Sequence, residues 1–450
     1  MTRHTLMPHQ ITDASFLAGR DVAGCFNGMG TGKTLTALEA CRLAEAENVL
    51  IIGPPISLQM WQREAEDWLG SKAQILKTGS TKIDASVRVL VVSYQIAVNR
   101  KNELMEWAGP GSVMICDESH ALKNTKAKRT VAILGRGGMI NAFKHAWFLT
   151  GTPMTRWADD LIPFLFRAAP DQIKDLTGGL TIDRFRLRYC ITVKKQWPGA
   201  RFPVEIVVGS RNHAELGEVM ATCSTRRILK DVWESMPSIT FTRLAVQPKG
   251  TKDLLDALKA MTMTQVEAGL RSNDDHLSTI RRQLGVSMIP DAASFIADRV
   301  DAEQGAILVG AWHTEVIDGL MEALSSVKID KRSLRVATLD GRTSQAKKSE
   351  LEAAYNNGDL DVLIGQIGAM GVSLNLQQGG SSIVVVEEDW SPAVMDQFYA
   401  RLHRMGQGLP VHVDTLYVDS KIAEAVHRIS TAKRHAHAAV SDAHQEGLDQ

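Results

Sequence analysis

The sequence predicts an α/β protein with two doubly wound parallel sheets and helical material between them. In the first third of the chain, short apolar runs alternate with amphipathic segments, and the runs lack the polar alternation of a half-exposed sheet. This pattern breaks between about Asp171 and Pro237 and resumes at Ala306. Strands that alternate with helices favour parallel sheets covered on both faces. The length of 450 residues suits two or three ordinary domains.

Each expected element follows from its local pattern. The first sheet is expected to contain strands at Asn48–Ile52, Val87–Val92, Val113–Cys116 and Trp147–Thr150. Helices are expected at Leu58–Leu69 and within Leu254–Leu284, and the charged segment 171–237 is also helix-prone. The second sheet is expected to contain strands at Ala306–Val309, Leu334–Leu339, Val362–Ile364, Ile383–Val386 and Val411–Tyr417. The polar tail after Ile429 is expected to fray.

Composition predicts a soluble intracellular protein. The chain is 44% hydrophobic and 23% charged, and no apolar run approaches the ~20 residues needed to cross a bilayer. The N-terminus lacks the apolar segment of a secretory signal. The five cysteines have no paired zinc-type spacing and are odd in number, which favours reduced thiols in the cytoplasm or nucleus. The formal net charge is zero and therefore neither indicates nor excludes nucleic acid.

Basic residues gather in three stretches that could follow a phosphate backbone, although each alone is typical of a solvated face. They are Lys123, Lys126, Lys128 and Arg129; Arg184, Arg186, Arg188, Lys194 and Lys195; and Arg226, Arg227 and Lys230.

A glycine-rich segment near the start predicts a phosphate-binding loop. It contains Asn27, Gly28, Met29, Gly30, Thr31, Gly32, Lys33 and Thr34. The glycines allow backbone N–H groups to point at phosphate oxygens, and the expected helix Thr34–Glu45 adds its positive N-terminal end. Lys33 is expected to reach the β- and γ-phosphates of ATP, and Thr34 to ligate Mg²⁺. The strict pattern has glycine at position 27, where this chain has asparagine.

Two carboxylates follow the apolar run Val113–Cys116. Carboxylates at the end of a buried strand are costly unless they hold a metal or perform acid–base chemistry. Asp117 is therefore a candidate Mg²⁺ ligand, and Glu118 a candidate base for the attacking water. The alternative is a solvated turn at the end of the strand.

Arg401 and Arg404 are expected to share a helix face with Gln397, without a local partner for either arginine. Arginine can stabilise charge on a transferring γ-phosphoryl group. A surface salt-bridge face is the alternative for this segment alone. If both segments serve one nucleotide, ATP turnover would be converted into movement between two lobes.

In their shared order, these motifs and several others resemble the Swi/Snf-related group of superfamily-two helicases over nearly the whole chain. The further motifs are Leu6–Gln10, Leu50–Pro55 with Trp61, Val91–Tyr94, Leu149–Pro153, Leu339–Thr343, Gly368–Leu376, Trp390–Pro392 and His403–Gln407. The resemblance implies two tandem RecA-like lobes, ATP and Mg²⁺ as ligands, and a DNA-dependent ATPase. It implies Gln10 as the adenine contact and adds Gly371 and Gln397 to the nucleotide site. The DNA contacts it implies are Pro54, Ser93, Tyr94, Gly151, Thr152, Gly341, Arg342, Thr343, Ser373 and Trp390. For Trp61, Tyr94 and Trp390, buried packing is an equal alternative.

Within this group, four segments resemble the annealing-helicase, or DNA-rewinding, branch. They are Asp117–Asn124, Gly151–Arg156, Gly209–Leu216 and Arg226–Val232. The chain departs from the usual pattern at Asn27, Gln366 and Asn375, which affects fine nucleotide contacts. No chromatin reader, zinc module or protein-recruitment domain is evident, so we expect a minimal monomeric motor with no membrane partner.

The expected organisation is an ATP-binding lobe (1–170), a helical and charged insertion with linker (171–240), a helical insertion (241–300), a C-terminal helicase lobe (301–430) and a flexible tail (431–450). The expected function is ATP-dependent translocation on duplex or forked DNA, with rewinding or remodelling as the output. Two alternatives remain at this point. One is a helicase that separates strands of DNA or RNA, and the other is a nucleic-acid-binding scaffold with an inactive ATP site.

Overall fold

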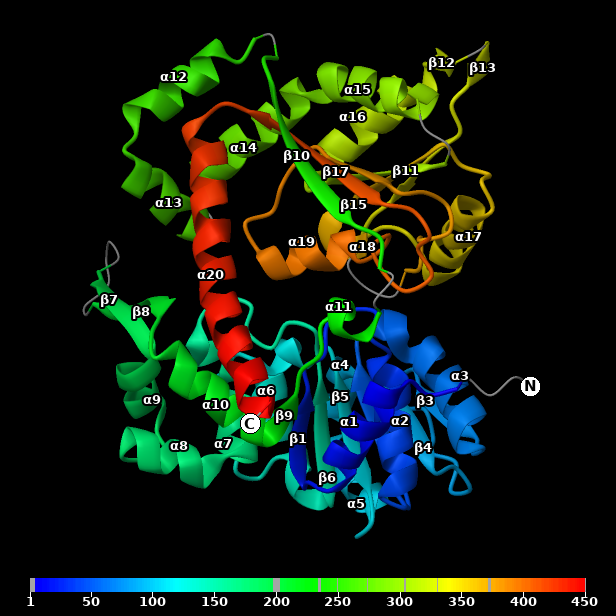
Figure 1. Cartoon of the computed structure of the whole chain (residues 1–450), viewed down its shortest axis with the longest axis vertical. Helices are drawn as coiled ribbons and strands as arrows, with labels where there is room; N and C mark the ends of the chain where they lie inside the picture. Colours follow the sequence, from blue (N-terminus) through cyan, green and yellow to red (C-terminus); the bar gives the residue numbers. More distant parts are fainter. Residues whose placement is uncertain are drawn as a thin grey trace. The chain divides into compact units, whose positions relative to one another are not determined.

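The computed structural model describes residues 5–196, 203–233, 236–248, 250–272, 274–302, 305–329, 331–370 and 374–449. It divides into two compact units (Figure 1). Unit 1 comprises Met1–Val232 and Lys433–Gln450, and unit 2 comprises Trp233–Ala432. The five segments expected from the sequence remain a prediction, because they subdivide the chain more finely than these two units.

Unit 1 is built on a seven-stranded sheet of order β3-β4-β2-β5-β6-β1-β9 in which every pairing is parallel. Its strands are β1 (Val22–Cys25), β2 (Val49–Gly53), β3 (Ala73–Leu76), β4 (Val89–Ser93), β5 (Val113–Asp117), β6 (His145–Leu149) and β9 (Ser224–Thr225). The four strands expected in this part are present, each shifted by at most two residues at either end.

Helices cover this sheet on both faces, as the apolar strands require. Successive residues of β2 enter different cores: Val49 and Ile51 lie in one, Leu50 and Ile52 in the other. The helices of unit 1 are α1 (Pro8–Ala18), α2 (Lys33–Leu43), α3 (Leu58–Leu69), α4 (Tyr94–Asn99), α5 (Lys101–Ala108), α6 (Lys128–Leu134), α7 (Ile162–Ala168), α8 (Pro170–Thr177), α9 (Ile182–Tyr189), α10 (His213–Cys223) and α11 (Leu229–Val232). Short 3₁₀ turns are η1 (Pro55–Ser57), η2 (Ser119–Leu122), η3 (Met139–Ala142) and η4 (Ala158–Leu161).

Unit 2 contains a second parallel sheet, of order β10-β17-β16-β11-β15-β14. Its strands are β10 (Ile239–Val246), β11 (Ile307–Ala311), β14 (Val336–Leu339), β15 (Val362–Gln366), β16 (Ser382–Val385) and β17 (Val411–Val418), and a small ribbon joins β12 (Lys328–Ile329) to β13 (Arg332–Ser333). Its helices are α12 (Lys252–Ala260), α13 (Met263–Ser272), α14 (Asp275–Ser287), α15 (Ile289–Ala302), α16 (Thr314–Ser325), α17 (Gln345–Asn356), α18 (Ile367–Met370) and α19 (Pro392–Tyr399). Two cores again flank the sheet. The predicted fold class, two doubly wound parallel-sheet lobes, is confirmed.

Leu254–Leu284 is helical as expected; it spans three helices, of which α14 begins after Asp274, whose carboxylate accepts from His276 N and Leu277 N. The structure differs from the sequence-based expectation in two segments. The segment 171–237 contains a β-hairpin of β7 (Cys190–Lys195) and β8 (Val204–Ser210), where β-branched residues favour strands. The tail does not fray, because α20 (Lys421–Asp449) continues through it and buries Ala436 and Val440 in a core of unit 1.

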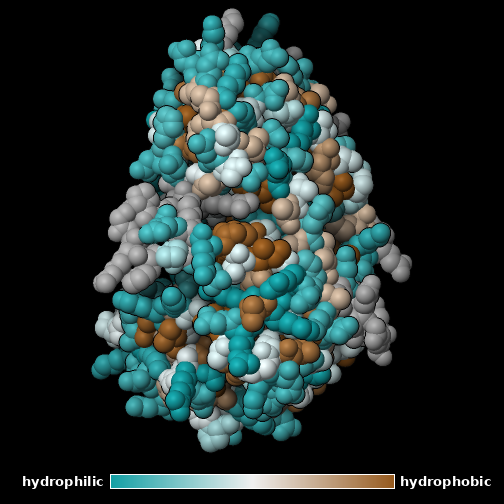
Figure 2. Space-filling view, turned by 90° about the vertical axis from the view of Figure 1, so that its left-hand side faces the viewer, coloured by the Kyte–Doolittle hydropathy of each residue, from teal (hydrophilic) through white to brown (hydrophobic). Residues whose placement is uncertain are grey.

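Hydrophilic residues predominate on the face shown in Figure 2, and apolar residues form small separate groups there. Large exposed apolar side chains include Leu187 in unit 1 and Phe241 in unit 2. Among the helices of the described residues, none combines the length and apolar character needed to cross a membrane.

Candidate nucleotide site

The candidate site of unit 1 lies where three neighbouring strands end. The phosphate loop follows β1, Asp117 ends β5, and Thr150 follows β6, which lies between them. Leu149 of β6 is in register with both Cys25 and Asp117. Ligand sites in parallel α/β sheets form at this carboxyl edge. The topology therefore brings together the two motifs that the sequence singled out.

The phosphate loop depends on left-handed glycines. Gly30 and Gly32 have φ values of 74° and 81°, in the region that favours glycine. Gly32 caps α2, which begins at Lys33 rather than at Thr34. The Lys33 Nζ donates to the carbonyls of Asn27 and Gly28, at 2.9 Å each. The ammonium group thus lies against the backbone of the loop that is expected to hold phosphate.

Helix α1 packs against the far end of the same loop. Gln10 is buried, and its Nε2 donates to the Gly32 carbonyl at 3.2 Å while its Oε1 accepts from Met7 N at 2.8 Å. A Cβ on Gly32 would lie 2.2 Å from this Nε2, so a side chain at position 32 would displace the Gln10 amide. His9, which the sequence did not single out, lies 2.9 Å from the Thr31 carbonyl through its Nε2. The adenine contact of Gln10 remains a prediction.

Asp117 is a buried carboxylate held by aromatic side chains. Its Oδ2 accepts from the Trp61 Nε1 at 2.7 Å, and its backbone carbonyl accepts from the Tyr94 hydroxyl at 2.7 Å. Burial, and then the Glu118 charge, raise the pKa of Asp117 to about 6, whereas the Trp61 hydrogen bond and the Lys33 charge oppose this rise. The influence of Lys33 links the phosphate loop electrostatically to the carboxylate.

For Trp61 and Tyr94, the structure supports the packing interpretation. Trp61 is fully buried, and Tyr94 is 7% exposed. Buried indole and phenol groups normally find a hydrogen-bond partner, and both do so at Asp117. The DNA contact expected of Tyr94 is therefore not open to its side chain in this structure. The spacing of a tryptophan on an amphipathic helix gave no signal that it would hold a carboxylate.

Glu118 has the left-handed backbone conformation, with φ 48° and ψ 49°. This region costs a residue with a side chain about 1–2 kcal/mol, and such residues concentrate at functional sites. Its Oε2 lies 3.2 Å from the Nδ1 of His120, and the same Nδ1 lies 3.3 Å from the Thr150 hydroxyl. His120 therefore links the acidic segment to the end of β6.

Gly151 packs against the phosphate loop. A Cβ built on Gly151 would lie 3.2 Å from the Met29 side chain and 3.6 Å from the Asn27 carbonyl. Thr152 is buried, and its N–H donates to the Thr150 hydroxyl at 3.1 Å. The DNA contacts expected of Gly151 and Thr152 remain predictions.

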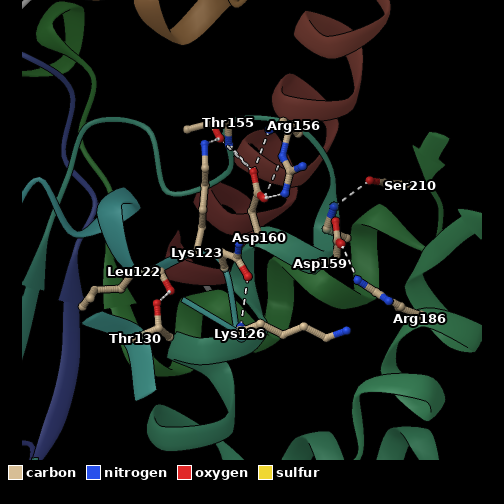
Figure 3. Close-up of polar contacts among 12 residues, drawn as sticks. Leu122, Lys123, Lys126, Thr130, Thr155, Arg156, Asp159, Asp160, Arg186 and Ser210 are labelled. Carbon is tan, nitrogen blue, oxygen red and sulfur yellow. Dashed lines mark hydrogen bonds and ion pairs between the residues drawn. The ribbon is translucent and has the colours of Figure 1, made fainter. Parts of the chain in front are cut away.

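The sequence analysis missed Asp160, which organises the segment after Gly151 (Figure 3). Its side chain is fully buried. It accepts from the Thr155 N–H and hydroxyl at 3.0 and 2.8 Å, and from the Arg156 N–H and guanidinium at 2.8 and 2.9 Å. Lys123 donates to the same Thr155 hydroxyl, and burial lowers the pKa of Lys123. This cluster joins the segment that follows Glu118 to the segment that follows β6.

A polar cavity of about 270 Å³ adjoins this cluster and is lined in part by Lys123, Arg156, Asp159 and Arg186. Arg186 donates to Asp159 at 3.1 Å (Figure 3). Lys123 and Arg186, which come from two of the basic stretches, thus line this cavity and are hydrogen-bonded to protein side chains.

Arg401 and Arg404 differ from the expectation in two respects. Helix α19 ends at Tyr399, so both residues follow the helix rather than sharing its face. Both guanidinium groups also have a partner that is distant in sequence: their Nη1 atoms donate to the Leu374 carbonyl at 3.0 and 3.3 Å. Arg401 is 8% exposed, and its Nε also donates to the Gln397 carbonyl at 2.9 Å.

The environment of these arginines is not a solvated salt-bridge face. Burial lowers the pKa of Arg404, and the charge of Glu352 opposes that shift. Burial raises the pKa of Glu352, whereas the Asn375 N–H and both arginines lower it. Asn375 N donates to Glu352 at 3.2 Å, so this unusual residue contributes through its backbone.

The remaining expected contacts are dispersed in the structure. Arg342 is paired with Asp340 and, at 2.7 Å, with Asp318. Trp390 faces the Arg281 guanidinium, 4.8 Å from the ring centre. Ser93 is buried and caps α4 at Ile96 N. The DNA contacts expected of Pro54, Gly341 and Thr343 remain predictions. Gly371 and Ser373 lie outside the described residues.

The donors of unit 1 fit a magnesium ion that is held mainly by a nucleotide. Mg²⁺ is usually bound through one or two protein ligands together with phosphates and water. Asp117 offers a carboxylate whose raised pKa a nearby cation would lower. In the described part of the chain, no cluster of three histidine, cysteine or carboxylate side chains forms a metal site.

Comparison with protein families gives two matches. Residues 9–281 match the SNF2-related domain, and residues 293–406 match the helicase conserved C-terminal domain.

Several curated proteins are similar to the chain. The SWI/SNF-related matrix-associated actin-dependent regulator of chromatin subfamily A-like protein 1 of Xenopus tropicalis is 25% identical over 91% of this chain and 42% of its own length. The mouse DNA annealing helicase and endonuclease ZRANB3 is 24% identical over 93% of this chain and 39% of its own. The mouse DNA repair and recombination protein RAD54B is 24% identical over 98% of this chain and 56% of its own length. The chain thus spans about two fifths to just over half of these relatives.

A solved structure, the Sulfolobus solfataricus SWI2/SNF2 ATPase core in complex with dsDNA, aligns over 99% of this chain and 96% of its own. The TM-score is 0.44 and the sequence identity 16%.

Proposed function

The chain belongs to the SNF2-related family, and from this premise we propose that it is a motor that hydrolyses ATP to move along duplex or forked DNA. The observation that carries the proposal is that Lys33 follows β1 and that Asp117 and Glu118 lie at the end of β5, at the same edge of one sheet with only β6 between these two strands. A phosphate loop alone would support nucleotide binding only. The carboxylate pair adds the means to activate water.

Each residue of unit 1 has a proposed role that suits its environment. Lys33 leaves the carbonyls of Asn27 and Gly28 and pairs with the β- and γ-phosphates of ATP. Thr34 and Asp117 would hold Mg²⁺, which would supply positive charge against the phosphates. Glu118 accepts the proton of the attacking water. The left-handed backbone of Glu118 supports this role, because strain of that kind is retained where position matters.

Arg401 and Arg404 are the proposed cations for the γ-phosphoryl group during transfer. Their burial supports the proposal. Removing a guanidinium group from water has a cost that a surface position would avoid, and such a cost is expected where the group serves an anionic ligand. Arg401→Lys and Arg404→Lys should retain ATP binding and lose most turnover, since lysine lacks the planar fork.

DNA as the track is supported by the relatives. Their names describe a DNA annealing helicase and DNA repair and recombination proteins. We propose that contacts to DNA are made mainly to phosphates and carry little sequence information. Rewinding or remodelling of forked DNA is the proposed output.

The test is an ATPase titration with single-stranded, duplex and forked DNA and with RNA, at a stated salt concentration. Phosphate release should rise most with duplex or forked DNA. Lys33→Ala should abolish it, whereas Lys72→Ala, an exposed lysine paired with Asp84, should not. Stimulation by single strands alone, together with robust strand displacement, would instead identify an unwinding helicase. Unchanged function in Lys33→Ala would identify a scaffold with an inactive site.

A further inference from the structure

The first residue of the phosphate loop is an asparagine with a buried acidic partner. Asn27 and Asp13 are both fully buried. The Asn27 Nδ2 donates to the Asp13 Oδ2 at 2.7 Å, and the Asn27 Oδ1 accepts from the Thr225 hydroxyl at 3.2 Å. Both polar ends of the amide are therefore satisfied, one by α1 and the other by β9.

Asp13 carries the charge of this pair. Burial raises its pKa, and the opposing influences are, in order, the Asn27 hydrogen bond and the charges of Arg227 and His9. The Arg227 Nη2 lies 3.5 Å from the Asp13 Oδ1. Burial, and then the charge of Asp13, raise the pKa of the Cys25 thiol, whereas the charge of Lys33 lowers it. The amide of Asn27 is thus the hydrogen-bond donor closest to a carboxylate that has little access to water.

Asn27 lies between two fixed elements at the point where the loop begins. On one side, Phe26 N donates to the Thr225 carbonyl at 2.9 Å and Gly28 N to the Arg227 carbonyl at 2.6 Å. On the other side, α1 holds the loop through Asp13 as well as through His9 and Gln10. The carbonyl of Asn27 accepts from Lys33. A displacement of Asn27 would therefore move the carbonyl that faces the phosphate-binding lysine.

We infer that Asn27 is a positioning residue of the phosphate loop and that positions 13 and 27 function only while they share one negative charge. The inference rests on the proposed role of this loop in binding ATP. A second carboxylate at position 27 would lie at hydrogen-bond distance from Asp13 in a dry site, where two like charges cannot both ionise. We expect the loop to move away at pH 8, where both carboxylates are driven to ionise, and the two groups to retain one proton between them at pH 6.

The experiment compares four variants by titration with a fluorescent ATP analogue, with Mg²⁺ and without DNA, at pH 8 and pH 6. The variants are Asn27→Asp, Asp13→Asn, the exchange Asp13→Asn/Asn27→Asp, and Asn27→Ala. At pH 8, Asn27→Asp should bind the analogue at least about tenfold more weakly than the wild type, as expected when a buried charge loses its donor. At pH 6 it should recover much of this loss, because one shared proton restores an O–H···O bond.

The exchange variant should bind within about threefold of the wild type at both pH values, since it restores one donor and one carboxylate. Asn27→Ala should bind weakly at both. The wild type, measured in parallel, controls for the effect of pH on other charged groups near Asp13, among them His9 and Arg227. Circular dichroism establishes that each variant is folded.

Two results would overturn the inference: wild-type binding by Asn27→Asp at pH 8, or an exchange variant that is folded yet binds as weakly as Asn27→Asp. The measurement uses no DNA and no hydrolysis. A wild-type protein that binds the analogue but shows no DNA-stimulated turnover would contradict the proposed motor and leave this inference standing.

Discussion

Replacing Asp117 by asparagine should stabilise the metal-free protein while it abolishes turnover. The pKa of Asp117 is raised from 3.8 to about 6, chiefly by burial. A raised carboxylate pKa means that the folded protein favours the protonated form. At pH 8 the ionised side chain therefore opposes folding, and this penalty decreases as the pH falls from about 6 to 3.8.

The magnitude follows from the same shift. The difference between 3.8 and about 6 corresponds to about 3 kcal/mol as an upper bound. Asparagine keeps an oxygen for the Trp61 indole N–H and has no charge, so most of the penalty should be removed. Allowing for the buried amide, we expect a gain of about 1–3 kcal/mol in the free energy of unfolding at pH 8. With an m-value of about 2–3 kcal/mol/M, the urea midpoint should rise by about 0.3–1.5 M.

The assay is urea unfolding followed by circular dichroism, with EDTA present, at pH 8 and pH 5. The gain should be largest at pH 8 and about half as large at pH 5, because the unfolded chain is still ionised at pH 5 and part of the penalty remains. Asp67→Asn, at an exposed position on α3, is the matched control and should change the midpoint little at either pH. A midpoint that does not rise at pH 8, or that rises equally at both pH values, would refute the reasoning.

Three further predictions concern residues outside the phosphate loop. Asp160→Ala should lower the free energy of unfolding by about 2–4 kcal/mol and reduce DNA-stimulated ATPase activity, because five donors from Thr155 and Arg156 lose their acceptor. Asp171→Asn, at an exposed position, is the control. Wild-type stability of Asp160→Ala in urea would contradict this prediction. The free energy of unfolding, measured in urea, should be about 1 kcal/mol higher for Glu118→Gly than for Glu118→Gln. Both variants lack the carboxylate, and glycine accepts φ 48° without strain. Equal urea midpoints would show that the left-handed backbone stores no strain. Burial lowers the pKa of His444 to about 4. Between about pH 6.5 and pH 4 the unfolded chain therefore binds a proton that the folded protein excludes, so wild-type stability should fall as the pH drops through this range. In His444→Gln that fall should be smaller; an identical pH dependence would indicate that His444 does not dock on Ser224.

Much of this fold could be predicted because the strands are apolar on both faces. A run such as Val49–Gly53 enters a core on each side of its sheet, so its position is visible in the sequence without knowledge of its neighbours. The phosphate loop and Asp117 were identifiable for a similar reason: both directly follow buried strands, and glycine or carboxylate residues are unusual there.

The errors occurred where tertiary contacts override local composition. The tail is polar on average, yet Ala436, Val440 and His444 on α20 are buried. Single buried residues one helical turn apart give little signal in a segment that is otherwise charged. Arg401 and Arg404 appeared unpaired because their acceptor is a backbone carbonyl some thirty residues earlier, at Leu374. Asp160 had no motif of its own, and its function as an acceptor depends on how the chain turns after β6.

The departure at position 27 was visible in the sequence, but its partner was not. Asp13 lies on α1, and nothing local indicates that its carboxylate is buried against the phosphate loop. A long-range pair of this kind becomes apparent only when α1, β1 and β9 are placed together.

The most direct test of the central claim is a comparison of wild type and Glu118→Gln in two measurements on the same samples: binding of ATP with Mg²⁺, and steady-state phosphate release with and without duplex DNA. The account predicts equal binding, release by the wild type that DNA accelerates, and release by Glu118→Gln reduced by at least about a hundredfold. Phosphate release by Glu118→Gln at the wild-type rate would contradict it, because the water would then be activated without the carboxylate that follows β5.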